Sequence, residues 1–176
     1  MIVGNGDIAS AILDRPDRLY FASGVSNSGE TNVFSYLRER RLLLAQPRDE
    51  HLVYFSSLCV FYSRTPYADH KRDMEITVRQ TFRRYTIMRL GNITWGVNPH
   101  TLINHLRARA ALGLPLDIQP VYRYVINLPE FRHWLGLIPP WACEMNCPGR
   151  RMLVSEIVKE YVLGDHVPIL AGQVAI

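Results

Sequence analysis

Four short and almost continuously apolar runs punctuate the first half of the chain, at 1–3, 18–22, 52–55 and 86–90. Neighbouring residues of a strand point to opposite faces of its sheet, so strands without polar alternation are expected to be covered on both faces. The stretches between these runs, at 7–13, 32–45 and 67–84, have helical character. Strands that alternate with helices predict βαβ units, and hence an α/β fold with a parallel sheet flanked by helices.

The pattern changes after Asn98. A helix is expected over Thr101–Leu112 and a strand over Tyr122–Leu128, followed by a loop rich in proline and tryptophan and a helix over Ser155–Val162. We therefore divide the chain into a core at 1–98 and a C-terminal portion at 99–176, within the single compact unit that 176 residues allow.

Composition narrows the classes of function. The net charge of +4 comes from arginines scattered along the chain, which do not form the basic stripe with interleaved aromatics of a nucleic-acid-binding protein. No apolar run approaches the roughly 18–20 residues of a membrane span, and the N-terminus lacks a secretory signal, so a cytoplasmic protein is expected. The three cysteines are then expected to be free thiols, and no second cysteine or histidine pair suggests a metal site.

A glycine-rich turn follows the first run. Gly4-Asn5-Gly6-Asp7-Ile8-Ala9 has the placement of a dinucleotide-binding loop, in which glycines allow a tight turn and the helix N-terminus faces a pyrophosphate. By itself the motif is weak, because a glycine-rich turn between a strand and a helix is also common for structural reasons. The charge of Asp7 does not favour an anion there.

The acidic residue that normally accompanies such a loop is missing. A dinucleotide fold places it at the end of a second strand, roughly 20 residues beyond the glycines, where it binds the adenosine ribose. The candidates Asp14, Asp17 and Glu30 do not end any predicted strand. We therefore predict no strand between the first helix and Arg18, and a sheet with fewer strands than usual.

A tyrosine and a lysine lie one helical turn apart, at Tyr67 and Lys71, in a helix that Thr65 can cap. Lys71 continues into a stripe of apolar residues, where a lysine is unusual. A nearby ammonium favours the phenolate form of a tyrosine and can make it a useful base. Ser57, at the end of the preceding strand, lies where ligands of parallel sheets bind.

Several segments together resemble the extended short-chain dehydrogenases/reductases that modify nucleotide sugars. The segment 53–61 is similar to the serine-bearing strand of that family, 65–75 to its Ser-Pro-Tyr-x-x-x-Lys-x-x-x-Glu helix, and Asn32-Val33 to the start of the helix before the strand. Segments 88–93, 123–131 and 145–149 with 155–158 resemble its later motifs, in family order. The resemblance implies a Rossmann-like sheet with a small C-terminal substrate-side portion.

The resemblance also implies roles. Ser57, Tyr67 and Lys71 would be catalytic, and Asn92 and Arg123 would contact the diphosphate of a nucleotide-sugar substrate. NAD or NADP would be bound by Tyr67 and Lys71 together with Gly4, Gly6, Ile8, Ala22 and Ser23. A homodimer would form through the helices 32–45 and 67–84, unless their surplus apolar residues cover sheet left open by missing strands.

Departures from the family pattern leave two functions open. The glycine loop is shorter than in the family, and the strand–helix units between the first helix and Arg18 are missing. Ser57 and Tyr67 are closer together in sequence, and Pro129-Glu130 replaces an Asp-Asp pair. The chain is also roughly half the family's length. The first function is an NAD(P)-dependent epimerase or dehydratase acting on a nucleotide sugar. The second is a catalytically degenerate relative that serves as a binding or assembly module.

Overall fold

The computed structural model describes residues 1–164 of the chain. Its main sheet has five parallel strands in the order β1-β2-β3-β4-β7. These are β1 (Ile2–Val3), β2 (Leu19–Phe21), β3 (Leu52–Ser57), β4 (Tyr85–Leu90) and β7 (Cys143–Cys147). The predicted α/β fold with a parallel, Rossmann-like sheet is confirmed. No strand lies between α1 (Asp7–Ala11) and β2 within residues 1–164, as expected.

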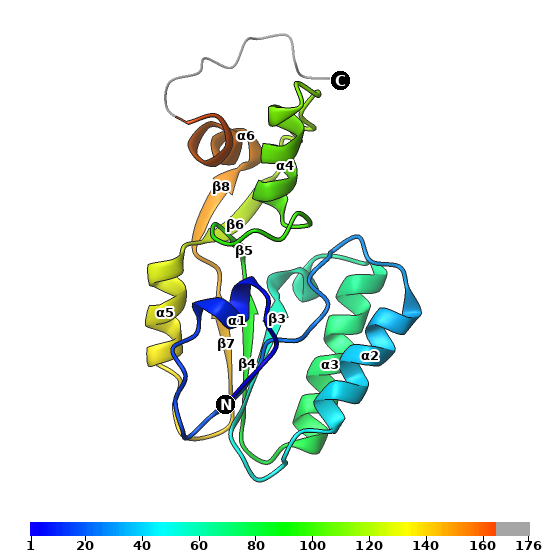
Figure 1. Cartoon of the computed structure of the whole chain (residues 1–176), viewed down its shortest axis with the longest axis vertical. Coiled ribbons are helices and arrows are strands. Elements are labelled where there is room, and N and C mark those ends of the chain that lie inside the picture. The colour runs from blue at the N-terminus through cyan, green and yellow to red at the C-terminus, as the bar shows by residue number, and fades with distance from the viewer. Residues whose placement is uncertain (165–176) are drawn as a thin grey trace.

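Helices cover both faces of this sheet (Figure 1). On one face α2 (Val33–Leu44) and α3 (Pro66–Thr81) run side by side, and on the other lie α1 and α5 (Leu128–Gly136). The strands divide their side chains between the two cores. In β3, Leu52 and Tyr54 pack in the core with α2 and α3, while Val53 and Phe55 pack in the core with α1 and α5. This double burial explains why the central strands are apolar at nearly every position.

A smaller lobe sits beyond the carboxyl end of the main sheet (Figure 1). Its three-stranded sheet has the order β5-β6-β8, formed by β5 (Asn92–Ile93), β6 (Tyr122–Ile126) and β8 (Arg150–Leu153). It packs with α4 (Leu102–Ala111) and with α6 (Val154–Ile157), which continues into a π-helix over Val158–Leu163. The chain enters this lobe after β4, returns to the main sheet for β7 and leaves it again.

The sequence located the first four strands and the helices α1 to α4 to within a few residues. It missed the short strand β5, the strands β7 and β8, the helix α5 and the short 3-10 helix η1 (Leu58–Phe61). β7 carries the polar residues Glu144 and Asn146 because it is an edge strand, and Glu144 binds arginines of α3 and β4. α5 begins with a local signal, the cap Asn127 and Pro129 in the first turn, at a place where the sequence analysis put the end of a strand and the start of a loop. Residues 165–176 of the expected C-terminal portion lie outside the described residues.

Gly4 shows why the turn after β1 needs glycine. Its φ is +128°, and an added Cβ would lie 2.3 Å from the carbonyl oxygen of Ala22. That close approach brings the glycine loop against the end of β2, where a side chain would force the two segments apart.

We expect Gly4→Ala to lower the free energy of unfolding by about 1–3 kcal/mol, because both the backbone angle and the contact with Ala22 become strained. The matched control is Gly136→Ala, in α5, where an added Cβ meets nothing within 4 Å. The control is expected to be neutral or to stabilise by about 0.4–1 kcal/mol. Urea unfolding followed by circular dichroism measures both. Equal stability of the two variants would contradict the close approach at Gly4.

Candidate functional site

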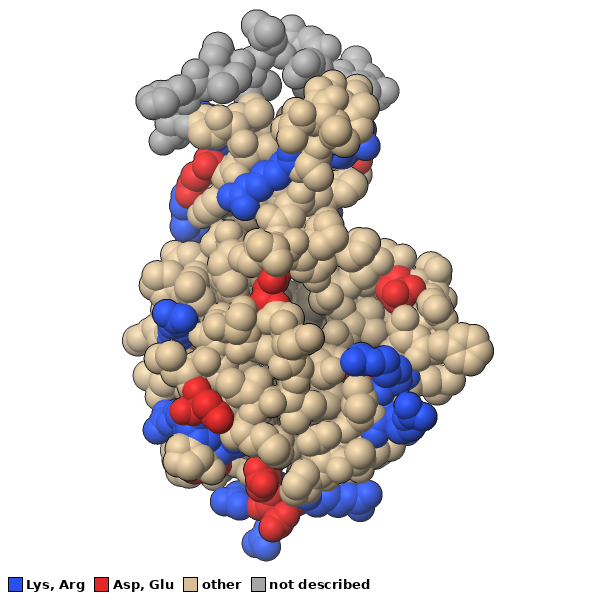
Figure 2. Space-filling model, in the orientation of Figure 1, with Lys and Arg blue, Asp and Glu red and all other residues tan. Residues whose placement is uncertain are grey.

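A cleft of about 1130 Å³ lies between the carboxyl end of the main sheet and the smaller lobe. Figure 2 shows a hollow in the surface beneath that lobe. The walls come from the glycine loop, the 21–28 segment after β2, the ends of β3 and β4, the start of α3, and the smaller lobe. This is the edge at which ligands of open α/β sheets bind.

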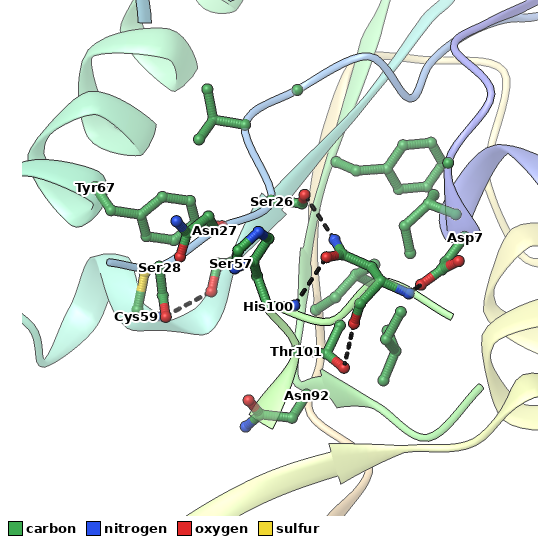
Figure 3. A pocket seen from close by; sticks show the side chains of 18 of the residues that line it. Asp7, Ser26, Asn27, Ser28, Ser57, Cys59, Tyr67, Asn92, His100 and Thr101 are labelled. Atoms are coloured by element: carbon green, nitrogen blue, oxygen red, sulfur yellow. Dashed lines mark hydrogen bonds between the residues drawn. The ribbon is translucent and has the colours of Figure 1, made fainter. Parts of the chain in front are cut away.

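The cleft brings together nearly all of the residues singled out in the sequence. Those that line it are Gly6, Ile8, Ala22, Ser23, Ser57, Tyr67, Lys71, Asn92 and Arg123. Gly4 does not line it, and supports it from behind through its contact with Ala22. In the close view of Figure 3, Ser57 and Tyr67 lie on one side of the pocket and Asp7 on the other.

Ser57 and Tyr67 come from adjacent elements. Ser57 is the last residue of β3, and its Oγ accepts a hydrogen bond of 3.2 Å from the backbone N–H of Cys59. Thr65 caps α3 as predicted, accepting from the N–H of Ala68, and so places Tyr67 in the first turn. Burial raises the pKa of the Tyr67 phenol well above its ordinary value, and the charges of Cys59 and Glu39 act in the same direction. The phenol is therefore protonated at neutral pH.

Lys71 is buried at the wall of the cleft, with 2% of its surface exposed. Its Nζ donates to Oε1 of Glu39 at 3.0 Å and to the hydroxyl of Tyr54 at 3.2 Å. It lies 5.8 Å from the centre of the Tyr67 ring. The expected stripe is present, since Met74 and Val78 are buried along the same helix. The ammonium thus faces the cleft wall and is already bonded to a carboxylate.

Glu39 is the main feature that the sequence analysis missed. Its carboxylate is fully buried and accepts hydrogen bonds from Lys71, the Tyr54 hydroxyl, His70 Nε2 and the backbone N–H of Val25. Burial opposes its ionisation, but the ammonium of Lys71 and the other donors outweigh burial and hold its pKa well below the usual range. One signal was available in the sequence. Glu39 stands four residues before the apolar Leu43, so the two side chains share the helix face that α2 buries.

At the glycine loop, where a pyrophosphate was expected, the start of α1 is in contact with another segment of the chain. The carboxylate of Asp7, in the first turn of α1, accepts hydrogen bonds from the backbone N–H groups of Val97 at 3.0 Å and Asn98 at 2.9 Å. The indole of Trp95 donates to the carbonyl oxygen of Asp7 at 3.0 Å. An added Cβ at Gly96 would lie 2.1 Å from the Asp7 side chain. The 94–98 segment is therefore packed directly against the start of α1.

These observations test whether the chain fits a dinucleotide. A pyrophosphate at the glycine loop would meet the negative charge of Asp7. A ribose near Lys71 would compete with Glu39 for the ammonium. No strand follows α1 to carry an acidic residue for the adenosine ribose within residues 1–164. Residues 1–164 therefore do not fit a complete NAD or NADP molecule.

The opposite side of the cleft is polar and contains cationic side chains. Asn92 donates from Nδ2 to the carbonyl oxygen of Tyr124 at 3.0 Å, and Arg123 donates to the carbonyl oxygen of Tyr122 at 3.2 Å. On the side of the main sheet, the sequence analysis did not single out Arg38 of α2, whose guanidinium lies 3.3 Å from the Ser23 hydroxyl. Arg38 and Arg123 can both offer hydrogen bonds to an anionic ligand.

Residues 1–164 contain no group of three or more His, Cys, Asp or Glu side chains placed to hold a metal ion. The cysteines Cys59, Cys143 and Cys147 are free thiols. None of the helices in this part of the chain is long and apolar enough to span a membrane.

Comparison with known proteins identifies the fold. The UDP-glucose 4-epimerase of Thermus thermophilus, solved with NAD, is 17% identical, with a TM-score of 0.57 over 82% of this chain and 60% of that chain. The UDP-glucuronic acid 4-epimerase of Bacillus cereus, solved with UDP-glucuronic acid and NAD, is 13% identical, with a TM-score of 0.60 over 81% and 57%. The dTDP-glucose 4,6-dehydratase of Bacillus anthracis, solved with NAD, is 15% identical, with a TM-score of 0.58 over 81% and 56%.

The similarity at these identities is one of fold. The chain spans between 56% and 60% of the length of these three structures. No protein-family model and no curated protein matches its sequence. The fold is therefore that of a Rossmann-like α/β protein, similar to the folds of the solved nucleotide-sugar epimerases and dehydratase named above.

The raised pKa of Tyr67 has a measurable consequence. We expect the difference between the ultraviolet pH titrations of wild type and Tyr67→Phe to show no phenolate from this residue below about pH 10, the ordinary tyrosine value. The pKa of the Tyr67 phenol is higher in the folded state than in the unfolded state. The folded state is therefore expected to lose stability as pH rises above about 10. Tyr122→Phe, on the exposed part of β6, is the control. A Tyr67 phenolate near pH 8 would contradict the assignment.

Proposed function

We propose that this chain is an epimerase/dehydratase-like protein that binds a nucleotide sugar in the cleft. Ser57 and Tyr67 contact a hydroxyl of the sugar, and Lys71 completes the set beside Tyr67. The observation that carries the proposal is the convergence of these three side chains on one cleft at the carboxyl edge of a Rossmann-like sheet. A cleft of about 1130 Å³ exceeds the roughly 300–1000 Å³ of most small-molecule pockets, so it has room for a nucleotide with an attached sugar.

Each side chain has a role that its surroundings support. The protonated Tyr67 phenol can donate a hydrogen bond or a proton to a sugar oxygen, and the Ser57 hydroxyl can orient that oxygen. Arg123 and Asn92, on the smaller lobe, are suited to a diphosphate. In this assignment 1–98 is the core and 99–176 supplies the substrate side, and the protein is cytoplasmic.

NAD or NADP would supply hydride transfer to such a reaction. The solved neighbours named above contain NAD, and Ala22, Ser23, Gly6 and Ile8 line the part of the cleft nearest the glycine loop. Because the described residues do not fit the whole dinucleotide, we propose weak binding of NAD and NADP by this chain and derive no step through either.

A second candidate is a binding or assembly module without turnover. Two carboxylates favour it. Asp7 lies at the glycine loop, where a pyrophosphate would bind, and Glu39 is hydrogen-bonded to Lys71, which a dinucleotide ribose would otherwise contact. Retention of Ser57, Tyr67 and Lys71 in one cleft favours the first candidate.

Isothermal titration with UDP-, GDP- and dTDP-sugars, NAD and NADP tests the proposal. We expect one class of nucleotide sugar to bind, and Arg123→Ala to weaken its binding about 10- to 100-fold, because a charge-assisted contact with phosphate is lost. Tyr67→Phe should retain binding, since it removes only one hydroxyl.

The matched control is Arg83→Ala, an exposed arginine just after α3 that does not line the cleft, and it should bind like wild type. Binding of the dinucleotides but of no nucleotide sugar would contradict the proposal. Product formation in the presence of NAD would favour the enzyme over the binding module.

We also propose a homodimer through the helices 32–45 and 67–84. Val33, Phe34 and Leu37 of α2 and Ile76 of α3 are 56%, 75%, 55% and 46% exposed, so these side chains do not cover the main sheet. Together they present apolar surface on two adjacent helices, of a kind that association would bury.

Replacing Phe34 and Leu37 by glutamate is expected to give a monomer, because buried charges oppose association of the α2 surfaces. Light scattering over a range of concentrations measures the mass of wild type and variant. Leu112→Glu, at an equally exposed apolar residue after α4, is the control and should retain the wild-type mass. A wild-type monomer at every concentration would rule out this dimer.

A further inference from the structure

The buried carboxylate of Glu39 connects the parts of the chain that form one wall of the cleft. Its Oε1 accepts from Lys71 Nζ of α3 at 3.0 Å and from the Tyr54 hydroxyl of β3 at 2.7 Å. Its Oε2 accepts from His70 Nε2 at 2.9 Å and from the N–H of Val25 at 2.7 Å. Two oxygens with four donors leave the carboxylate fully satisfied without solvent.

The segment after β2 is shaped to fit this group. An added Cβ on Gly24 would lie 2.9 Å from both Glu39 Oε1 and Lys71 Nζ. The backbone of this segment therefore closes over the ion pair, and Gly24 and Val25 form cleft wall on their other side. The Glu39 carboxylate therefore holds both the Lys71 ammonium and the backbone of the segment after β2, through Val25.

The geometry points to Glu39 as a positioning residue for the Ser57–Tyr67–Lys71 set: it holds the Lys71 ammonium at the cleft wall, where its hydrogen bonds go to Glu39 and Tyr54 and not to the Tyr67 hydroxyl. Lys71 makes its two hydrogen bonds to Glu39 and Tyr54, and its ammonium lies 5.8 Å from the centre of the Tyr67 ring. The negative charge of Glu39 offsets the positive charge that would otherwise favour a Tyr67 phenolate.

The surroundings of both groups agree with this role. Burial is the largest cause of the raised pKa of Tyr67, and the charges of Cys59, Glu39 and Tyr36 act in the same direction. The hydrogen bond with Ser57 lowers this pKa. Glu39 itself faces Lys71 and His70 as charged or titratable donors, and His70 is held in place by stacking on Tyr36, with ring centres 4.4 Å apart. The set as folded therefore suits hydrogen bonding to a ligand better than removal of a proton from it.

The chain offers an internal control for a test, because it contains only two lysines, Lys71 and Lys159. Lys159 is exposed on the π-helix. Acetylation with acetic anhydride, followed residue by residue by mass spectrometry, reports how accessible each amine is in the full chain. In wild type we expect Lys71 to react at least about ten-fold more slowly than Lys159, because it is buried and paired.

Glu39→Gln should raise the acetylation rate of Lys71 at least about ten-fold and leave that of Lys159 unchanged. A second readout addresses Tyr67, which a purely structural ion pair would not affect. The pH midpoint of Tyr67 ionisation is obtained from the difference between the titrations of Glu39→Gln and of the Glu39→Gln, Tyr67→Phe double variant. This midpoint should fall by about one pH unit or more relative to its wild-type value. Unchanged Lys71 reactivity overturns the inference, and so does increased reactivity with an unchanged Tyr67 midpoint.

Gly24→Ala keeps the inference testable if Glu39→Gln does not fold. This change keeps both charges but places a methyl group between Glu39 and Lys71, and it should raise Lys71 acetylation and lower the Tyr67 midpoint in the same way. Gly136→Ala is the matched control and should change neither. Wild-type values of both readouts in a folded Gly24→Ala variant would overturn the inference.

The inference rests on the proposed function for the importance of Lys71, but both readouts are made without a ligand. Failure of nucleotide-sugar binding would overturn the proposed function and leave the measured role of Glu39 intact. Fast acetylation of Lys71 in wild type would overturn the role of Glu39 whether or not a nucleotide sugar binds.

Discussion

The hydrogen-bonded carboxylate of Glu39 constrains the whole wall of the cleft. It joins α2 to β3 through Tyr54, to α3 through Lys71 and His70, and to the segment after β2 through Val25. A buried charge without partners would be costly, and removal of one partner of such a pair typically costs about 3–5 kcal/mol. The four contacts satisfy this buried charge, and they join α2, α3, β3 and the segment after β2 beside Ser57 and Tyr67.

A second ionic cluster holds the opposite edge of the sheet. The guanidinium of Arg89 in β4 binds Glu75 of α3 at 2.5 Å and Glu144 of β7 at 2.6 Å, and Arg79 of α3 also binds Glu144. This cluster attaches the late strand β7 to a sheet that the first half of the chain begins. Because β7 leads into β8, it also supports the smaller lobe above the cleft.

The main sheet shares its fold with the solved nucleotide-sugar enzymes named above, and two carboxylates of this chain lie beside the cleft at its carboxyl edge. Asp7 attaches the 94–98 segment to the glycine loop, and Glu39 neutralises Lys71. Both contacts satisfy groups that a dinucleotide would otherwise contact. On the side of the smaller lobe, Asn92 and Arg123 donate to backbone carbonyl oxygens of β6, so the contacts made by the polar side chains differ between the two halves of the cleft.

The order of strands and helices up to β4, the capped helix carrying Tyr67 and Lys71, and the placement of Ser57 were readable in the sequence, because they depend on periodicity and capping between near neighbours. The edge strand β7 was not, since its polar residues are explained only by arginines on other elements. The partners of the buried charges were not readable either. Glu39 and Lys71 are 32 residues apart, and Asp7 and Asn98 are 91 apart. The sequence by itself determined that Ser57, Tyr67 and Lys71 lie near the carboxyl edge of the sheet. The tertiary structure decided their charge environment, because a buried charge takes its partners from whatever the fold packs beside it.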